Sequence, residues 1–162
     1  MSDCSVIHDT FTIERSYLAV PSRVFAAFAS KDAKRNWAYI SDLEAVEGVP
    51  VTSEFDFRIG GRERFGFRRH GANYRYDARY YDIVPGKRII FSYEMYADEA
   101  RISVSVATIE FANRGDGTAL AWTEQGAYLD GIDGHEAPGL RHEGTAEMLD
   151  HLPDYLNADA LR

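Results

Sequence analysis

The sequence predicts an α+β domain in which a long antiparallel sheet is covered by one C-terminal helix. Most of the chain between Phe55 and Gln125 alternates apolar and polar residues with the period of two that is typical of β-strands. Between Gly139 and Leu156, apolar residues recur instead every three to four positions, as on one face of a helix. Because the apolar face of a sheet has to be covered, we expect this helix to lie across the sheet.

The segment before the sheet is predicted to form one strand and two short helices. Alternating apolar residues indicate a strand from His8 to Leu18. Pro21 is expected in the first turn of the first helix, where a missing amide hydrogen removes no bond. Ser30 is expected to cap a second helix that ends near Trp37. A weaker strand prediction falls on Asp42–Val46.

Turn signals divide the following stretch into about six antiparallel strands. Gly60-Gly61 is typical of a two-residue hairpin, and Pro85-Gly86 fits the two central positions of a type II turn. The apolar residues from Ile102 to Val106 are even-numbered, whereas Ile109 and Phe111 are odd-numbered. One extra residue near Ala107 would keep both series on one face, so we expect a β-bulge there.

The C-terminal helix is predicted to bury one stripe and to bend near its end. The stripe consists of Thr145, Leu149, Leu152 and Leu156. Pro153 lies inside the predicted helix and has no amide hydrogen for the carbonyl of Leu149. We therefore expect a kink at this proline.

Composition and charge argue against several classes of protein. The 162 residues suggest one domain over 1–162, with residues 1–7 and 158–162 at its periphery. The net charge of −8 disfavours nucleic-acid binding, although Arg58 to Arg88 contains nine Arg/Lys and three Asp/Glu. No apolar run approaches the length of about 18 residues that a membrane span needs. With Cys4 as the single cysteine and no secretory leader, we expect a cytoplasmic protein.

Few residues indicate metal or covalent chemistry. His142-Glu143 resembles the start of the zinc motif HExxH, but Ala146 stands where the second histidine would be. Neither a GxSxG nucleophile motif nor a phosphate-binding glycine loop occurs. We therefore predict no metal site and no cofactor.

Three separated motifs resemble a known family. The stretch Tyr81–Tyr93, YDIVPGKRIIFSY, is similar to a hairpin of the SRPBCC superfamily, in the branch related to the activator of the heat-shock-protein-90 ATPase. Thr123–Gly131, TEQGAYLDG, resembles a second element of that branch, and His142–Thr145 with Leu149–Leu152 resembles its terminal helix. The resemblance covers about residues 8–157. It implies a START-like helix-grip fold, in which a curved antiparallel sheet wraps around a long C-terminal helix and leaves a cavity between them.

This resemblance leaves three functions open. The first is binding of a small hydrophobic or aromatic molecule in the cavity. The second is a cofactor-free cyclase, hydrolase or dehydratase of polyketide-like substrates, although the chain has no complete catalytic signature. The third is a chaperone-partner domain like the ATPase activator. We expect a small molecule as partner, with no nucleic acid and no membrane, and leave a homodimer open.

The alternation also predicts the residues that line the cavity and contact the ligand. They share the apolar phase of their strands or, for the last one, the inner face of the helix: Phe55, Phe57, Phe65, Phe67, Tyr76, Tyr80, Phe91, Tyr93, Trp122 and Met148. The phenols among them are able to orient a ligand's polar groups.

Glu124 is the candidate catalytic residue. Alternation places it on the same face as Leu120 and Trp122, so a carboxylate is expected to point inward, with Tyr76 or Tyr80 as its hydrogen-bond donor. A buried carboxylate is costly unless it is paired, and such groups often act as an acid, a base or a ligand anchor. The alternative is that alternation lapses at the strand end and Glu124 reaches water or an arginine.

Overall fold

The computed structural model describes residues 4–38, 52–69 and 71–160. Its elements follow one another along the chain as β1 (Val6–Tyr17), α1 (Pro21–Ala29), α2 (Lys31–Trp37), β2 (Thr52–Phe55), β3 (Arg62–Arg69), β4 (Ala72–Val84), β5 (Arg88–Ala97), β6 (Ala100–Arg114), β7 (Gly117–Leu129) and α3 (Ala137–Ala160). The strand predicted at Asp42–Val46 lies outside the described residues.

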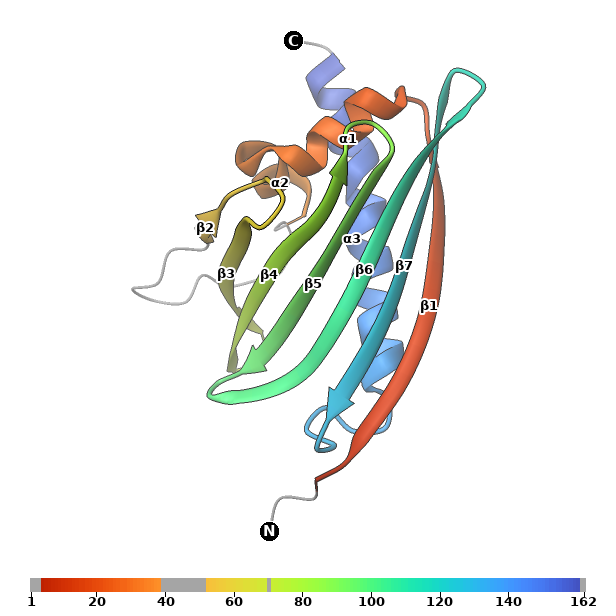
Figure 1. Ribbon diagram of the computed structural model, residues 1–162. Helices are drawn as coiled ribbons and strands as arrows, with labels where there is room; N and C mark the ends of the chain where they lie inside the picture. The colour runs from red at the N-terminus through yellow and green to blue at the C-terminus, as the bar shows by residue number, and fades with distance from the viewer. Residues whose placement is uncertain (1–3, 39–51, 70, 161–162) are drawn as a thin grey trace.

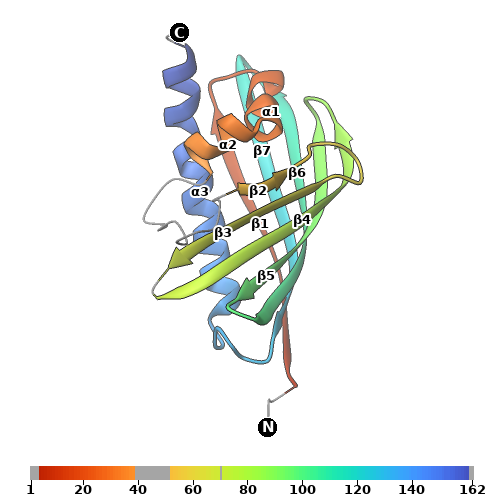
Figure 2. The ribbon, with the colours of Figure 1, turned by 90° about the vertical axis from the view of Figure 1, so that its left-hand side faces the viewer.

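The strands of the described residues form one antiparallel sheet in the order β1-β7-β6-β5-β4-β3-β2. Strands β2 to β7 are neighbours in sequence order, and β1 returns to the far edge, where Val6 pairs with Leu129 and Tyr17 with Thr118. The sheet curves around α3, which crosses its concave side, while α1 and α2 lie at one end (Figures 1 and 2). The predicted α+β class and helix-grip architecture are confirmed.

One stripe of α3 covers the sheet. Thr145, Leu149, Leu152 and Leu156 are each at most 7% exposed, as their spacing predicted. Burial of each leucine contributes about 1.5–3 kcal/mol to folding. Throughout residues 4–38, 52–69 and 71–160, no helix is long and apolar enough to cross a membrane.

Pro153 lies within α3, and the helix continues through it to Ala160. Because proline has no amide hydrogen, the carbonyl of Leu149 loses its partner within the helix. The buried hydroxyl of Tyr17 in β1 donates to this carbonyl at 3.0 Å. The sheet therefore satisfies the acceptor that the proline leaves unpaired, and this bond ties α3 to β1. The bend at Pro153 stays a prediction.

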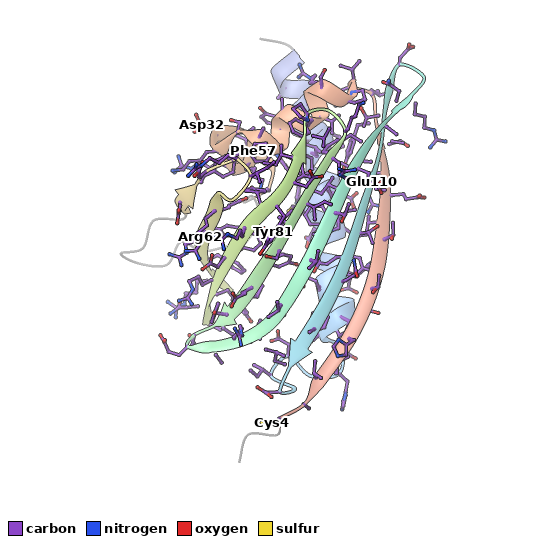
Figure 3. All side chains as sticks on the ribbon, viewed as in Figure 1. Cys4, Asp32, Phe57, Arg62, Tyr81 and Glu110 are labelled. Carbon is purple, nitrogen blue, oxygen red and sulfur yellow. The ribbon has the colours of Figure 1, made fainter. Side chains whose placement is uncertain are left out.

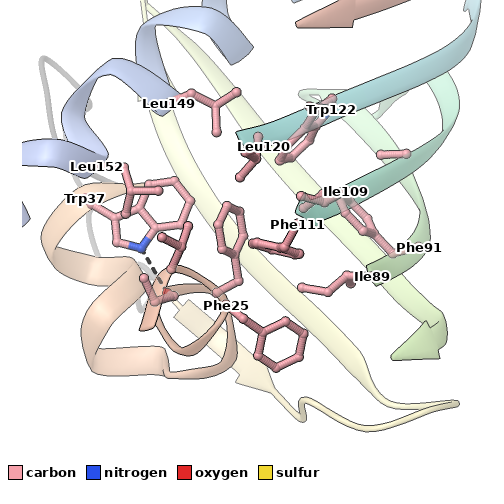
Figure 4. Close-up of a cluster of buried hydrophobic side chains, with 14 of the residues drawn as sticks. Phe25, Trp37, Ile89, Phe91, Ile109, Phe111, Leu120, Trp122, Leu149 and Leu152 are labelled. Atoms are coloured by element: carbon pink, nitrogen blue, oxygen red, sulfur yellow. Dashed lines mark hydrogen bonds between the residues drawn. The ribbon is translucent and has the colours of Figure 1, made fainter. Parts of the chain in front are cut away.

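Helices α1 and α2 close one end of the sheet with aromatic side chains (Figure 4). The ring of Phe28 meets Trp37 edge-on, with 4.7 Å between centroids, and Phe111 of β6 at 5.5 Å. Nε1 of the fully buried Trp37 donates to the carbonyl of Ala27 at 2.9 Å, the bond dashed in Figure 4. Ser30 caps α2 by accepting from the amide three residues further on, as predicted.

Two turns were predicted from glycines, and one of them is longer than expected. Gly86 has a φ of +70°, and the Lys87 amide donates to the Val84 carbonyl at 2.9 Å, which fits the predicted type II turn. Gly60 also has a positive φ, of +83°. However, β2 already ends at Phe55 and β3 begins at Arg62, so the connection is longer than a two-residue hairpin.

Strand β6 differs from the prediction. No register shift occurs at Ala107; the shift lies between Met95 and Tyr96 of β5, which leaves Ile102 of β6 as the extra residue. Beyond this bulge the outward side chains are valines and the inward ones are serines: Val104 and Val106 are 38% and 42% exposed, and Ser103 and Ser105 are buried. The predicted inward phase of the two valines is therefore wrong, because the two serines on the inner face accept hydrogen bonds from Arg141 of α3.

Candidate functional site

A cavity of about 440 Å³ lies between the sheet and α3. Its wall is formed by inner-face side chains of β3 to β7, by α1 and α2, and by one face of α3. The wall is mainly aromatic and aliphatic, and the volume lies within the range of about 300–1,000 Å³ that is usual for small-molecule sites. Side chains that point to the opposite face of the sheet, such as Tyr81, are exposed on the outer surface (Figure 3).

The structure places all but one of the predicted contact residues at this cavity. Those at the wall are Phe57, Phe65, Phe67, Tyr76, Tyr80, Phe91, Tyr93, Trp122 and Met148. Phe55 is not part of the wall: it stacks on Phe57, with 6.3 Å between ring centroids, and Lys34 Nζ lies 5.6 Å from its ring. Because β2 ends at Phe55, the alternation does not continue to Phe57, and the two side chains need not point the same way. Ligand contact by these residues stays a prediction.

Glu124 lies at the centre of a buried polar group that we call the Arg141 cluster: Tyr93, Ser103, Ser105, Trp122, Glu124 and Arg141. The Glu124 carboxylate is 0% exposed and accepts three hydrogen bonds. The donors are the Tyr93 hydroxyl at 2.5 Å, Trp122 Nε1 at 3.2 Å and Arg141 Nη1 at 3.3 Å. Alternation therefore predicted the inward direction of Glu124 correctly, whereas its tyrosine partner is Tyr93 and not Tyr80, whose hydroxyl donates to Glu63.

Arg141 extends from the first turns of α3 toward the inner face of β6. Its Nη1 also donates to the Tyr93 hydroxyl at 2.8 Å and to Ser105 Oγ at 3.3 Å, and its Nη2 donates to Ser103 Oγ at 2.7 Å. The Arg141 side chain is 14% exposed and forms an ion pair with Glu124. These bonds explain why serines occupy the inner face of β6, because a buried arginine needs acceptors for its donors.

The protonation states in this cluster favour hydrogen-bond donors. Burial raises the pKa of Tyr93 well above its ordinary value, and Glu124 raises it further, although Arg141 acts in the opposite direction. Burial is the largest single effect and lowers the pKa of Arg141, but Tyr93, Glu124 and Tyr128 together raise it by more, so the guanidinium stays charged. Tyr93 is therefore a neutral donor to Glu124 and not an activated phenolate.

A second buried group lies where α2 meets β3, and we call it the Glu63 cluster: Lys34, Glu63 and Tyr80. Glu63 is 1% exposed and Lys34 13%, and Lys34 Nζ lies 2.9 and 2.6 Å from the two carboxylate oxygens. The Tyr80 hydroxyl donates to the same carboxylate. Both charges at this part of the wall are thus compensated within the protein.

Sequence reasoning missed the partners of both buried carboxylates. Glu63 lies two residues before Phe65 and four before Phe67, so strict alternation already placed its side chain on the same, inward face. Arg141 carried a weaker signal: it is one turn before Thr145, the first residue of the predicted stripe. Neither Lys34 nor Arg141 could be matched to its carboxylate, because the partners come from elements far apart in the chain.

The comparisons with known proteins decide the family. Residues 18–157 match the family described as "Activator of Hsp90 ATPase homolog 1-like protein". The chain belongs to this family. No match was found among curated proteins.

Solved structures of similar sequence share the fold of this family member. A protein from Rhizobium loti is 47% identical, with 93% of this chain and 99% of that chain covered and a TM-score of 0.81. A protein from Rhizobium leguminosarum is 40% identical, with 96% and 99% covered and a TM-score of 0.84. A protein from Chromobacterium violaceum is 27% identical, with 91% and 96% covered and a TM-score of 0.69.

Proposed function

We propose that this family member binds a small hydrophobic or aromatic molecule in the cavity between the sheet and α3. The observation that carries the proposal is the cavity itself, about 440 Å³ in volume and walled mainly by aromatic and aliphatic side chains. A pocket with an apolar wall and a few convergent polar groups is the usual form of a small-molecule site.

The state of the buried charges favours binding over catalysis. Glu124 and Glu63 each accept hydrogen bonds from a cation and from a tyrosine hydroxyl. A general base has to lie within hydrogen-bond reach of the proton that it removes, whereas Glu124 is 0% exposed and is not part of the cavity wall. Because the Glu124 carboxylate already accepts from three donors, we infer that it holds Arg141 and Tyr93 in place as a polar anchor.

Gly144 provides a direct test of the binding site. It lies on the cavity face of α3, and a Cβ at this position would have no atom within 4 Å. A larger side chain is therefore expected to enter the cavity without a backbone clash. Gly139 is the matched control: it lies on the same helix, a Cβ there also meets no atom within 4 Å, and it is not part of the wall.

The experiment is a titration of the protein with Nile red, an uncharged apolar dye whose fluorescence rises on burial. We expect saturable binding by the wild type and by Gly139→Leu, and a loss of at least about tenfold in affinity for Gly144→Leu, since the leucine takes up part of the volume that is open to a ligand. Both variants replace a helical glycine, so they share any gain in helix propensity. Equal binding by Gly144→Leu and the wild type would show that the dye binds elsewhere.

A chaperone-partner role is the second candidate, and the match to the Hsp90 ATPase activator family is the observation that favours it. Its test is the ATPase rate of Hsp90 with and without this protein. Stimulation that persists in Gly144→Leu would support a chaperone role independent of the cavity. No stimulation at saturating protein would eliminate this candidate.

A further inference from the structure

Two buried side-chain polar atoms of the described residues have no hydrogen-bond partner, the Tyr128 hydroxyl and Nε2 of His151. Both residues line the cavity. They lie far apart, because His151 is ten residues beyond Arg141 on α3, about 15 Å along the helix axis. Tyr128 is 5% exposed and lies beside Arg141, whose guanidinium carbon is 5.4 Å from the centroid of its ring. A buried hydroxyl is normally hydrogen-bonded, so this one points to a partner within the cavity.

Gly126 holds the Tyr128 hydroxyl in a defined place. A Cβ at position 126 would lie 3.0 Å from the Tyr128 hydroxyl oxygen and 3.1 Å from Ser105 Oγ. The absence of a side chain at Gly126 therefore lets the Tyr128 ring lie against the sheet, next to the Arg141 cluster. The hydroxyl is positioned by packing and not by a hydrogen bond. Because the oxygen itself is buried, the ring has to turn toward the cavity for a ligand group to reach it.

This end of the cavity offers donors and few acceptors. The Glu124 oxygens already accept three hydrogen bonds. Burial, with smaller contributions from Glu124 and Asp9, raises the pKa of Tyr128 to about 12, although Arg141 acts to lower it. The Tyr128 phenol therefore keeps its proton at neutral pH and has it available for an acceptor. A ligand group that complements this end has to supply an oxygen acceptor.

The charges around the cavity disfavour an anionic ligand. Arg141 and Lys34 are already paired with Glu124 and Glu63. Among the described residues, three further carboxylates line the cavity on exposed positions: Asp133, Glu143 and Glu147. A ligand carboxylate would enter past these like charges and find both buried cations compensated.

We propose that the ligand is an uncharged, mostly apolar molecule with a carbonyl oxygen, which accepts a hydrogen bond from the Tyr128 hydroxyl at the Arg141 end of the cavity. This inference rests on the proposed ligand-binding function. It adds the chemical class of the ligand and assigns Tyr128 as the residue that recognises its polar group.

The test compares three probes with the same ring system: 2-acetylnaphthalene, which has a carbonyl group; 2-ethylnaphthalene, which has none; and 2-naphthoate, which is an anion. Dissociation constants are measured for the wild type, for Tyr128→Phe and for Tyr81→Phe, which removes a hydroxyl from the exposed outer face. We expect Tyr128→Phe to weaken binding of 2-acetylnaphthalene about three- to tenfold, the usual effect of one lost hydrogen bond, and to leave 2-ethylnaphthalene unchanged. The wild type should bind 2-naphthoate more weakly than the ketone, with a smaller difference at high salt.

The outcomes separate this inference from the function on which it rests. If the neutral probes bind and Tyr128→Phe weakens both equally or neither, the carbonyl assignment is wrong while the ligand-binding function stands. Tighter binding of 2-naphthoate than of the ketone would overturn the preference for an uncharged ligand. If none of the probes binds to the wild type, both the function and the inference are overturned. Retained binding of 2-ethylnaphthalene by Tyr128→Phe shows that this variant is folded.

Discussion

Replacement of Glu124 by glutamine should destabilise the protein strongly, although the two side chains have almost the same size. The glutamine removes the charge that pairs with Arg141, whose side chain is 14% exposed. It also turns one acceptor oxygen into an NH2 donor, among the donors Tyr93, Trp122 and Arg141. The variant thus leaves a buried cation without its counter-charge and places the new amide NH2 next to other hydrogen-bond donors.

The expected loss is about 3–5 kcal/mol, the usual cost of removing one partner from a buried ion pair. For a domain of this length, 1 kcal/mol corresponds to about 2–4 °C in Tm, so Glu124→Gln should melt roughly 6–20 °C below the wild type. The double variant Glu124→Gln/Arg141→Met should recover much of this loss, because it removes the unpaired cation as well. As a control, Asp56→Asn breaks the exposed 2.6 Å pair with Arg58 and should change the free energy of unfolding far less.

Urea unfolding followed by circular dichroism measures the free energy of unfolding of these variants. A Glu124→Gln variant within about 1 kcal/mol of the wild type would refute the reasoning, because it would show that Arg141 does not depend on this carboxylate. A double variant that is no more stable than the single one would refute the specific role of the unpaired cation.

Three further predictions concern the helix, alkaline pH and the cavity wall. Tyr17→Phe leaves the Leu149 carbonyl unpaired and should cost about 1–3 kcal/mol in urea unfolding. The addition of Pro153→Ala should recover part of this loss, because it restores an amide donor within the helix. No recovery would contradict the view that the Tyr17 hydroxyl replaces the donor that Pro153 lacks. The pKa of Tyr128 is raised from 10.0 to about 12 on folding, so its contribution to stability is complete below pH 10 and is lost as the pH rises toward 12. Tyr128→Phe should therefore show a shallower decline of the free energy of unfolding over this pH range. A decline identical to that of the wild type would contradict this contribution of Tyr128. Trp122→Ala should cost near the lower end of about 3–5 kcal/mol, because the ring already borders the cavity, and a loss below about 1 kcal/mol would show that the ring is not packed.

Periodicity predicted the parts of the fold in which one face of an element is uniformly apolar. The stripe from Thr145 to Leu156 has no polar competitor on its face, so helical spacing alone placed it correctly. Alternation likewise placed Glu124 inward, since its neighbours on that face are Leu120 and Trp122.

Periodicity failed in the first half of β6, where the inner face is polar. Val104 and Val106 are typical core residues and Ser103 and Ser105 typical surface residues, so the apolar phase of this strand was assigned to the wrong side. The inner serines make sense only with Arg141, which reaches them from α3. That contact is set by the tertiary structure, and local spacing in the sequence holds no signal for it.

The central claim is that the space between the sheet and α3 is a ligand site, and native mass spectrometry tests it most directly. The protein is incubated with an equimolar mixture of uncharged aromatic compounds that includes 2-acetylnaphthalene, and the masses of the intact complexes are recorded. The account predicts complexes of one ligand per chain for the wild type and for Gly139→Leu, and far fewer for Gly144→Leu, whose side chain enters the cavity. The absence of any complex with the wild type, or equal complexes with Gly144→Leu, would contradict it.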